Sequence, residues 1–363
     1  MSSFHQLTIK EIIKETENAV SISFIIPESL KETFSYKPGQ YITIKKELEG
    51  KKLRRAYSIC SSPKSGELKV TVKKVEKGLF SVFAATQLQK GDVLEVHPPE
   101  GKFVMQLEPN KNYIAFAAGS GITPVLSMVK TVLESEPSAT FTLVYGNKNA
   151  EDTIFYNELN QLAATYPTQF NLDYVFSRSN KKPNLFKTFF GKKSDAKTLF
   201  GRIDKSIVNF IVKNKYKNIT FDKAFLCGPE GMIKTVSKTL EGNGFSSEDI
   251  LFELFTTATS KEANPVQGGG GETQVTFLLD GETTSVKMQQ TDSLLDVALN
   301  NNLDAPYSCQ GGICSSCMAK IKDGEAVMAK NSILSDAEIK KGYILTCQAH
   351  PTTPQLTVDY DDV

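Results

Sequence analysis

The sequence predicts a multidomain protein that combines a small antiparallel β-barrel, an α/β doubly wound domain and a small α+β module. A chain of 363 residues is too long for one hydrophobic core. Short alternating strands fill its first part, strands and helices alternate in its middle, and a hairpin followed by one helix opens its last part. We expect the barrel at residues 1–108, the α/β domain at 109–259, a flexible linker at 260–272 and the last module at 273–363.

The barrel is predicted from short segments in which apolar and polar residues alternate, as they do in half-buried strands. Glycine and proline interrupt these segments, and short strands with such turns are typical of small antiparallel barrels. The clearest segments are residues 40–44, 68–72 and 92–96.

The α/β domain is predicted from a change of rhythm at Tyr113. An apolar strand at 113–118 is followed by a glycine turn, a helix over about 124–134 and another strand at 141–145. Strand and helix continue to alternate, which is the βαβ pattern of a doubly wound parallel sheet. The further segments are 155–164, 170–176 and 223–227.

The last module follows a segment that has no hydrophobic periodicity and ends in four consecutive glycines, a composition typical of a flexible tether. Its opening hairpin is predicted from two alternating segments, 274–279 and 284–288, separated by an Asp-Gly turn. A helix over about 293–300 then leads to a cysteine-rich loop.

Three cysteines of that loop are spaced C-x4-C-x2-C, and a fourth follows after a gap of 29 residues. This is the spacing of a plant-type 2Fe-2S centre. Small residues at 310–312 and 315–316 let the backbone approach the inorganic sulfides and offer N–H groups. The alternatives fit less well, because structural zinc usually takes two close cysteine pairs and unliganded core cysteines rarely cluster in a glycine-rich loop. The predicted cluster ligands are Cys309, Cys314, Cys317 and Cys347.

The distribution of charge favours docking to a protein partner, and charge and hydropathy together argue against nucleic-acid binding and a membrane span. The net charge of +1 divides unevenly, because residues 274–363 hold 12 acidic and 6 basic side chains, a net charge of −6, which leaves +7 for the rest. Such asymmetry favours electrostatic docking of the acidic module, either on the basic body or on an external partner. We expect no nucleic-acid binding, no membrane span and no signal peptide, and therefore a cytoplasmic protein. Cys60 and Cys227 give no sign of a disulfide framework.

A short motif, Arg55-Ala56-Tyr57-Ser58, follows the first strands. A lone Arg-x-Tyr-Ser is usually just a surface strand, but here it resembles the flavin motif of the ferredoxin–NADP reductase family. In that family the arginine pairs with the flavin phosphate, the tyrosine lies against the isoalloxazine ring and the serine hydroxyl reaches the flavin N5 atom. These roles suit a planar cation, an aromatic face and a small donor. The resemblance implies FAD, with FMN as the alternative.

A second segment, Gly78-Leu79-Phe80-Ser81, precedes an apolar stretch that reads as a helix whose N-terminus could face an anion. The family binds the flavin pyrophosphate at this position, so the resemblance implies contacts from Gly78, Leu79 and Ser81. An ordinary capped helix is the alternative interpretation.

The glycine turn, Gly119-Ser120-Gly121-Ile122-Thr123-Pro124, sits between a buried strand and a helix. Glycines permit a tight turn and close approach of N–H groups to a pyrophosphate, and proline in the first helical turn needs no donor. Proline replaces the third glycine of the usual dinucleotide fingerprint, which matches the reductase family. Gly119, Gly121, Thr123 and Pro124 are the predicted nucleotide contacts.

Two later segments gain roles from the same resemblance. The turn Cys227-Gly228-Pro229 borders the nicotinamide in the family, with the cysteine near the transferred hydride, although a cysteine at a strand end is otherwise most often core. Glu253 and Phe255 stand where the family places a carboxylate and an aromatic ring beside the flavin, and a last buried strand is the alternative. Ser58, Cys227 and Glu253 are therefore the predicted catalytic residues.

Ser177 and Arg178 end the strand predicted at 170–176. They resemble the family's clamp for the 2′-phosphate of NADPH. An acidic residue there would have favoured NADH, and none is present. We therefore expect NADPH as the electron donor, although a lone arginine is often just a solvated loop residue.

The resemblance implies an electron-transfer chain: a hydride passes from NADPH to the flavin N5 atom, and single electrons pass to the cluster and onward. None of the three histidines lies in a Glu-x-x-His or Cys-x-His setting, so we expect no di-iron or Rieske centre and a separate terminal oxygenase or hydroxylase as the acceptor. The domain order and the segments 306–309 and 342–351 resemble the reductase subunits of phenylacetyl-CoA epoxygenases, which implies a place in phenylacetate catabolism.

Other interpretations remain open. Phthalate-dioxygenase-type reductases share the order of domains but use FMN and NADH, and reductases of other hydroxylases or desaturases share the motifs. A redox sensor that holds flavin and cluster without turnover is an alternative of a different class, although it would not need the intact nucleotide motifs.

Overall fold

The computed structural model describes residues 4–76, 78–178, 198–255, 270–307 and 309–363. Residues 4–53 and 57–255 form one compact unit, and the described chain from 270 onward makes up most of a second. The predicted linker at 260–272 lies mostly outside the described residues, and its last residue, Glu272, begins a strand. Among the described helices, none has both the length and the apolar composition needed to cross a membrane.

The first part of the chain is an antiparallel sheet with the strand order β4-β3-β6-β1-β2-β5. Ile59, directly after β4, forms an antiparallel bridge with Val70 in β5, so the two ends of the order meet and the sheet closes into a barrel. The predicted antiparallel barrel is confirmed. Its strands are β1 (His5–Thr16), β2 (Ala19–Ile25), β3 (Tyr41–Leu48), β4 (Lys51–Ser58), β5 (Leu68–Lys73) and β6 (Val93–Val96), and its helices are η1 (Glu28–Leu30), η2 (Pro63–Ser65) and α1 (Leu79–Thr86).

The second part is a parallel sheet with the order β10-β9-β8-β7-β11-β12. Its strands are β7 (Asn112–Ala118), β8 (Thr140–Asn147), β9 (Phe170–Phe176), β10 (Thr198–Phe200), β11 (Lys223–Gly228) and β12 (Ile250–Leu254). The helical segments are η3 (Gly119–Gly121), α2 (Ile122–Ser135), α3 (Tyr156–Thr165), α5 (Lys205–Asn209), the π-helical η4 (Phe210–Lys215), α6 (Glu230–Glu241) and η5 (Ser247–Asp249). Doubly wound topology is thereby confirmed.

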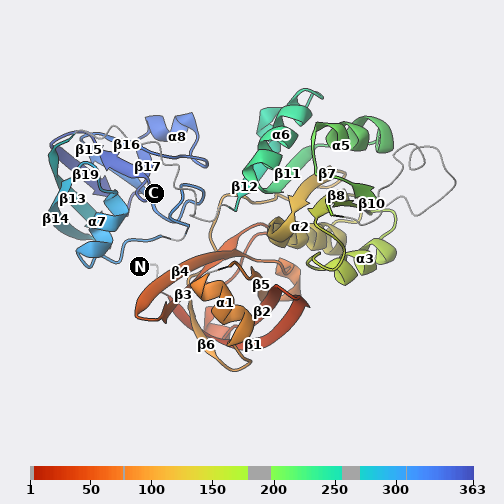
Figure 1. Cartoon of the computed structure of the whole chain (residues 1–363), viewed down its shortest axis with the longest axis horizontal. Coiled ribbons are helices and arrows are strands. Elements are labelled where there is room, and N and C mark those ends of the chain that lie inside the picture. Colours follow the sequence, from red (N-terminus) through yellow and green to blue (C-terminus); the bar gives the residue numbers. More distant parts are fainter. Residues whose placement is uncertain (1–3, 77, 179–197, 256–269, 308) are drawn as a thin grey trace. The chain divides into compact units, whose positions relative to one another are not determined.

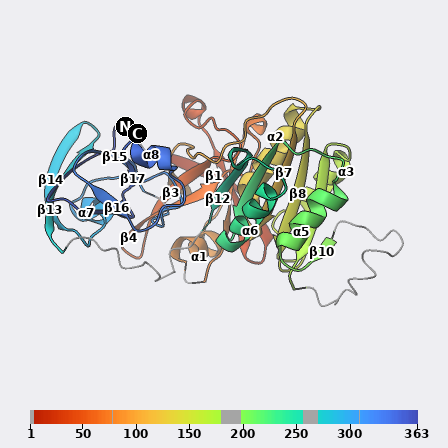
Figure 2. The ribbon, with the colours of Figure 1, turned by 90° about the horizontal axis from the view of Figure 1, so that it is seen from above.

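Helices cover both faces of this sheet: α2 and α3 lie on one face and α5 and α6 on the other (Figures 1 and 2). The strand order reverses at β7, because β8, β9 and β10 follow it on one side and β11 and β12 lie on the other. Open α/β sheets bind ligands outside the carboxyl ends of the strands at such a switch point. The glycine turn at 119–121 directly follows β7 and therefore occupies that place.

The C-terminal unit is a five-stranded mixed sheet with the order β14-β13-β19-β15-β17, beside a two-stranded ribbon of β16 and β18. Of the predicted apolar face of helix α7, Leu294, Leu295 and Ala298 are buried in the core with Val275, and Leu299 is partly buried against it. Its elements are β13 (Glu272–Leu279), β14 (Glu282–Gln289), α7 (Leu294–Asn300), β15 (Met318–Asp323), β16 (Ala326–Met328), α8 (Asp336–Lys340), β17 (Tyr343–Leu345), β18 (Ala349–Pro351) and β19 (Gln355–Asp359).

The hairpin of this unit forms where the sequence predicts it. Asp280 and Gly281 have φ angles of 54° and 75°, and a two-residue turn with both φ angles positive matches the twist of the flanking strands. Helix α7 begins after Ser293, whose side chain accepts a hydrogen bond from the Asp296 N–H group. Serine at this position satisfies a backbone donor of the first helical turn.

Candidate functional site

The three predicted catalytic residues come from three different strands and lie together. Ser58 is the last residue of β4, and Cys227 and Glu253 are paired neighbours on β11 and β12. The Ser58 Oγ atom donates a hydrogen bond of 3.3 Å to Oε2 of Glu253. All three side chains are buried. The barrel strand with the predicted flavin motif therefore meets the end of the nucleotide sheet at this point.

Burial sets the protonation states of this group. It raises the pKa of Glu253 to about 8, against a smaller opposing effect of the Ser58 hydrogen bond. Burial also raises the pKa of the Cys227 thiol, and the Glu253 carboxyl raises it further. At neutral pH the site therefore holds a mostly protonated carboxylic acid and a neutral thiol, so Ser58 contacts an uncharged partner.

The glycine turn is held tightly against the same strand end. A Cβ atom on Gly121 would lie 2.1 Å from the Cys227 carbonyl oxygen, so only glycine fits there. Gly119 has a φ angle of 57°, and its carbonyl accepts a hydrogen bond of 2.8 Å from the buried Tyr145 hydroxyl. The Thr123 hydroxyl donates to the Ser120 carbonyl at 3.0 Å. These contacts fix the N-terminus of α2, with Pro124 in its first turn, beside Cys227.

The predicted flavin segments lie on β4 and at the start of α1. The Tyr57 ring packs against Phe80 of α1, with ring centroids 5.6 Å apart. Ser81 accepts a hydrogen bond of 3.1 Å from the Val75 N–H group and donates to the Gly78 carbonyl at 3.2 Å. Leu79 is the first residue of α1, so this turn presents the N-terminus of the helix. The Arg55 guanidinium donates to the neighbouring Arg54 carbonyl at 2.7 Å.

Ser177 and Arg178 continue past β9 alongside the end of β8. The Ser177 N–H group donates to the Asn147 carbonyl at 2.9 Å, and the Arg178 N–H group donates to the Lys148 carbonyl at 2.8 Å. Arg178 and Lys148 thus leave the sheet at the same carboxyl edge as the glycine turn. Pro229 caps α6 on that edge as well, and Phe255 follows β12 directly with a ring that is 37% exposed.

Lys73 is a site residue that the sequence does not single out. It ends β5, and its Nζ atom lies 3.6 Å from the position of a Cβ atom built on Gly119. Burial lowers the pKa of Lys73, and the cation of Lys148 lowers it further. The Lys73 ammonium thus approaches the glycine turn, and the Lys148 cation is near enough to act on it, an arrangement that suits a polyanionic ligand. Because Lys73 and Gly119 are 46 positions apart in different domains, no local motif joins them.

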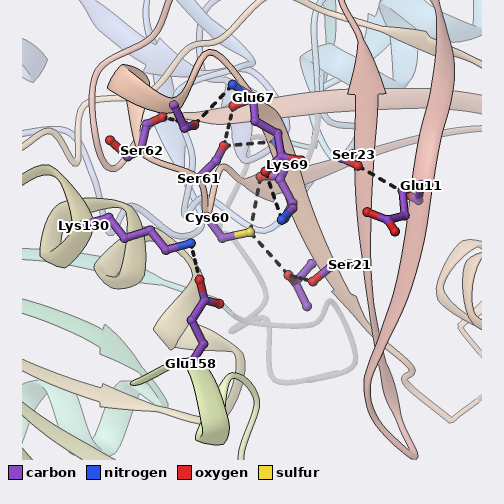
Figure 3. Close-up of polar contacts among 12 residues, drawn as sticks. Glu11, Ser21, Ser23, Cys60, Ser61, Ser62, Glu67, Lys69, Lys130 and Glu158 are labelled. Carbon is purple, nitrogen blue, oxygen red and sulfur yellow. Dashed lines mark hydrogen bonds and ion pairs between the residues drawn. The ribbon is translucent and has the colours of Figure 1, made fainter. Parts of the chain in front are cut away.

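Cys60, two residues beyond Ser58, is a packing residue (Figure 3). Its thiol donates to the Lys69 carbonyl at 3.3 Å and contacts the Thr71 hydroxyl at 3.5 Å. Burial raises the pKa of the Cys60 thiol to about 12. The next residue, Ser61, accepts a hydrogen bond of 2.6 Å from Ser127 of α2 at its carbonyl, which ties the barrel to the nucleotide domain.

The four cysteines of the C-terminal unit converge as two pairs. Cys314 is placed to donate a hydrogen bond to Cys309, and Cys317 to Cys347, which raises the pKa values of the two donor thiols. A hydrogen bond from Cys314 lowers the pKa of Cys309 to about 6, and N–H groups of the loop lower it further. Two neighbouring thiol pairs suit a binuclear iron centre, in which each iron takes two cysteine ligands.

The backbone of the cysteine loop leaves no room for larger residues. Gly312 has a φ angle of 70°, and a Cβ atom there would lie 2.6 Å from the Lys330 carbonyl oxygen. The Gly311 N–H group donates to the Cys309 sulfur at 3.3 Å. Within the described ranges, no three His, Cys, Asp or Glu side chains are grouped closely enough to hold a single metal ion. The loop thus fits a cluster with sulfur ligands and N–H donors.

Comparison with known proteins agrees with this geometry. Residues 6–105 match the oxidoreductase FAD-binding domain, residues 116–238 the oxidoreductase NAD-binding domain, and residues 277–352 the 2Fe-2S iron-sulfur cluster binding domain. The chain is 36% identical over 364 residues to one of the subunits of 1,2-phenylacetyl-CoA epoxidase from Escherichia coli (strain K12), with 99% of each chain covered. The chain belongs to the ferredoxin–NADP reductase family, with a ferredoxin domain fused at its C-terminal end.

Other relatives align with nearly the whole chain. The reductase is 30% identical to the ferredoxin reductase component of 3-ketosteroid-9-alpha-monooxygenase from Rhodococcus rhodochrous, with 98% of this chain and 96% of the relative covered. The solved structure of phthalate dioxygenase reductase shares the fold, with a TM-score of 0.59 at 23% identity and 98% of each chain covered. The reductase is thus an oxidoreductase that uses FAD, a pyridine nucleotide and a 2Fe-2S cluster.

Proposed function

We propose that this chain takes electrons from NADPH and delivers them, through FAD and the 2Fe-2S cluster, to a terminal oxygenase of the 1,2-phenylacetyl-CoA epoxidase type. The observation that carries the reaction is the contact between Ser58 of the flavin strand and Glu253, beside Cys227 of the nucleotide sheet. Hydride transfer requires the two ligands to meet, and this is where their binding elements meet.

The protein contributes orientation and tuning more than acid–base chemistry. When bound, the flavin accepts two electrons as a hydride and releases them singly, which matches a two-electron donor to a one-electron cluster. Ser58 would place its hydroxyl at the flavin N5 position, with Glu253 orienting that hydroxyl. Cys227, as a neutral thiol, would pack against the nicotinamide ring and exclude water. Arg55 and Tyr57 would hold the flavin phosphate and ring, and α1 would face its pyrophosphate through Gly78, Leu79 and Ser81.

The nucleotide would lie over the glycine turn of Gly119, Gly121, Thr123 and Pro124, with Gly228, Pro229 and Phe255 at its reactive end. Arg178 and Ser177 would contact the 2′-phosphate of NADPH, which supports NADPH over NADH. Lys148 lies beside Arg178 through a backbone hydrogen bond, so the local charge at this edge is positive. NADH lacks that phosphate and would gain little from this charge.

The three domain matches fall inside the boundaries 1–108, 109–259 and 273–363. A tether at 260–272 would let the ferredoxin domain reach both the flavin and an external acceptor. A dozen flexible residues span about 20 Å in root-mean-square distance. The cytoplasm is the compartment that suits this chemistry, because its reducing poise keeps free thiols such as the six cysteines reduced.

The choice of acceptor follows the relatives. The epoxidase relative is 36% identical to this chain and the 3-ketosteroid monooxygenase component 30%. The 30% identity to the 3-ketosteroid monooxygenase component supports a different oxygenase as the alternative acceptor. Both assignments share the electron path and differ only in the protein that receives the electrons.

Two experiments test the proposal. The first is anaerobic titration of the purified holoprotein with NADPH, followed by visible absorption. Bleaching of both the flavin and the iron-sulfur bands is expected. If NADPH bleached neither the flavin bands nor the iron-sulfur bands, the redox-sensor interpretation would be favoured. The second experiment measures NADPH-dependent turnover of the oxygenase components of a phenylacetyl-CoA epoxidase and of a 3-ketosteroid 9-alpha-monooxygenase side by side. Preference for the steroid enzyme would reject the epoxidase assignment and leave the electron path intact.

A further inference from the structure

Ser127 of α2 makes a buried hydrogen bond to the barrel. Its Oγ atom donates to the Ser61 carbonyl at 2.6 Å, and Ser127 is 0% and Ser61 2% exposed. A short bond at such a depth is costly to leave unmade, because the carbonyl would lose its partner without gaining water. The bond therefore fixes one position of α2 relative to the barrel.

The barrel side of this bond is a rigid continuation of the strand that carries the predicted flavin motif. The Ser61 hydroxyl donates to the Glu67 carbonyl at 2.6 Å and accepts from the Lys69 N–H group at 3.1 Å (Figure 3). The Cys60 N–H group donates to the Lys69 carbonyl at 2.9 Å. Only two residues separate Ser61 from Ser58, a distance of at most about 10 Å along extended chain. A shift at the Ser61 carbonyl would therefore reach Ser58.

The helix side of the bond leads directly to the glycine turn. Helix α2 begins at Ile122, immediately after Gly121, and Ser127 lies six residues beyond Gly121, about 9 Å along the helix axis. A helix of this length is stiff, because its own hydrogen bonds hold each turn. Movement of α2 at Ser127 would therefore move the turn that is proposed to bind the nucleotide.

The packing beside this hydrogen bond is largely apolar. Ala19 and Cys60 of the barrel belong to the same hydrophobic core as Val125 and Met128 of α2. Apolar contact is non-directional, so it holds the two domains together without fixing their register. A hydrogen bond depends on both distance and angle. The Ser127 hydroxyl thus supplies the directional contact that the surrounding core lacks.

We propose that Ser127 is a positioning residue for hydride transfer. Its hydrogen bond to the Ser61 carbonyl holds the nucleotide turn at the distance from the flavin strand at which the nicotinamide and the flavin N5 atom can react. The inference rests on the function proposed above and adds to it a residue outside the predicted ligand contacts. Such placement matters, because a misplacement of about 1 Å can slow a reaction about 100-fold.

The test is Ser127→Ala in the full holoprotein, with flavin reduction by NADPH followed anaerobically by stopped-flow absorption. The limiting rate constant should fall about tenfold, whereas the dissociation constant for NADPH should change less than about twofold, because the bond orients the reactants and does not touch the nucleotide. The long-wavelength charge-transfer band between flavin and nicotinamide, which requires the two rings to stack, should weaken. Ser127→Cys keeps nearly the same volume with a weaker donor, so its rate constant should be intermediate.

Thr131→Val is the matched control. Thr131 lies one turn further along α2, is buried and donates its hydroxyl to the Ser127 carbonyl at 2.7 Å, so this variant loses a buried hydroxyl but no bond to the barrel. Its limiting rate constant should stay within about twofold of the parent value.

The outcomes separate this inference from the function on which it rests. A parental rate constant in Ser127→Ala would overturn the positioning role, as would an equal fall in Thr131→Val or a loss confined to NADPH affinity. If Ser127→Ala does not retain its flavin, Ser127→Cys decides, and a parental rate constant in that variant overturns the role. A parent protein whose flavin is not reduced by NADPH would reject the proposed function itself, and the positioning role with it.

Discussion

The proposed hydride-transfer site around Glu253 (the hydride end) and the proposed cluster site around Cys309 (the cluster end) both hold buried side chains, yet the pKa of an acidic group shifts in opposite directions in the two places. Glu253 has one weak partner, the Ser58 hydroxyl, so burial dominates and raises its pKa to about 8. Cys309 is only partly buried, and its pKa falls to about 6 because a neighbouring thiol and N–H groups donate hydrogen bonds to it. The supply of donors, more than the depth of burial, decides which group is charged.

This difference matches the two kinds of chemistry. Hydride transfer does not need a fixed negative charge in the site, and Glu253 carries no charge when it is protonated. A cluster needs thiolates, and hydrogen bonds from the neighbouring thiols and from loop N–H groups lower the pKa of Cys309 and Cys347, whereas the pKa values of Cys314 and Cys317 are raised. Substitutions at either end can therefore separate the two chemistries.

Cys314→Ser should abolish the cluster and spare the hydride end. The serine hydroxyl stays protonated at neutral pH and ligates iron poorly, whereas the thiolate is the natural ligand. Iron content should fall to background, and reduction of an oxygenase or of cytochrome c by NADPH should fall more than about 100-fold. The rate constant for flavin reduction by NADPH, measured by stopped-flow absorption, should stay within about twofold of the parent value.

Cys60→Ser is the matched control for that change. Cys60 is also buried, but it hydrogen-bonds only within the barrel. The iron content of the Cys60→Ser variant should therefore equal that of the parent. Retention of the iron-sulfur absorption bands by Cys314→Ser would contradict the assignment of the ligands.

Glu253→Gln should remove a pH dependence of stability. The folded-state pKa of about 8 lies above the ordinary value of 4.5, so the carboxyl contributes fully below pH 4.5. Between these two values the unfolded chain loses the proton that the native state keeps, so stability declines until pH passes 8. The difference in unfolding free energy between parent and variant should shift by a few kcal/mol, on the order of 1.4 kcal/mol per pH unit at most. Urea unfolding at pH 5, 6.5 and 8 measures it, and parallel curves for the two proteins would contradict the prediction.

The same contrast explains how much of the site could be predicted from sequence. Short motifs carry the groups that are proposed to touch ligands, so the cluster cysteines can be predicted from their spacing, and Ser58 and Gly121 from the resemblance of their motifs to those of the family. Other residues that surround them come from distant strands: Lys73 approaches Gly119, and Tyr360 lies in the core that contains Cys317. No local pattern marks such contacts, because they exist only once the sheets have formed.

The fold shows a similar division. The alternation of apolar and polar residues and the Asp-Gly pair between the two segments predict the hairpin of β13 and β14. Their prediction succeeds because a two-residue turn leaves little freedom in the register of the strands. The start of α2 is less well predicted: the helix begins at Ile122, two residues before the expected position. Its start is set by the packing of Gly121 against the Cys227 carbonyl, which is a tertiary contact.

Arg178→Ala should weaken the binding of NADPH but not of NADH. The comparison tests whether the basic residues at the carboxyl ends of the strands bind the 2′-phosphate. The KM for NADPH should rise about tenfold, which is typical of one lost charge-assisted hydrogen bond. The KM for NADH should change less than about twofold, since NADH carries no 2′-phosphate. Steady-state kinetics with ferricyanide measures both constants without the cluster, and an equal rise for both nucleotides would reject the clamp.

Thr346→Val should give the smallest effect and probes the supply of donors at the cluster end. Thr346 is fully buried and donates both its hydroxyl and its N–H group to the Cys317 carbonyl, so valine keeps one of the two bonds and nearly the same volume. Loss of the hydroxyl should lower the unfolding free energy of the ferredoxin domain by about 1 kcal/mol and speed cluster release to a chelator a few-fold. Thr283→Val on the exposed face of β14 should change neither. A cluster held as firmly in Thr346→Val as in the parent would mean that the Thr346 N–H group alone anchors Cys317, and that the donors which matter at this end are backbone groups.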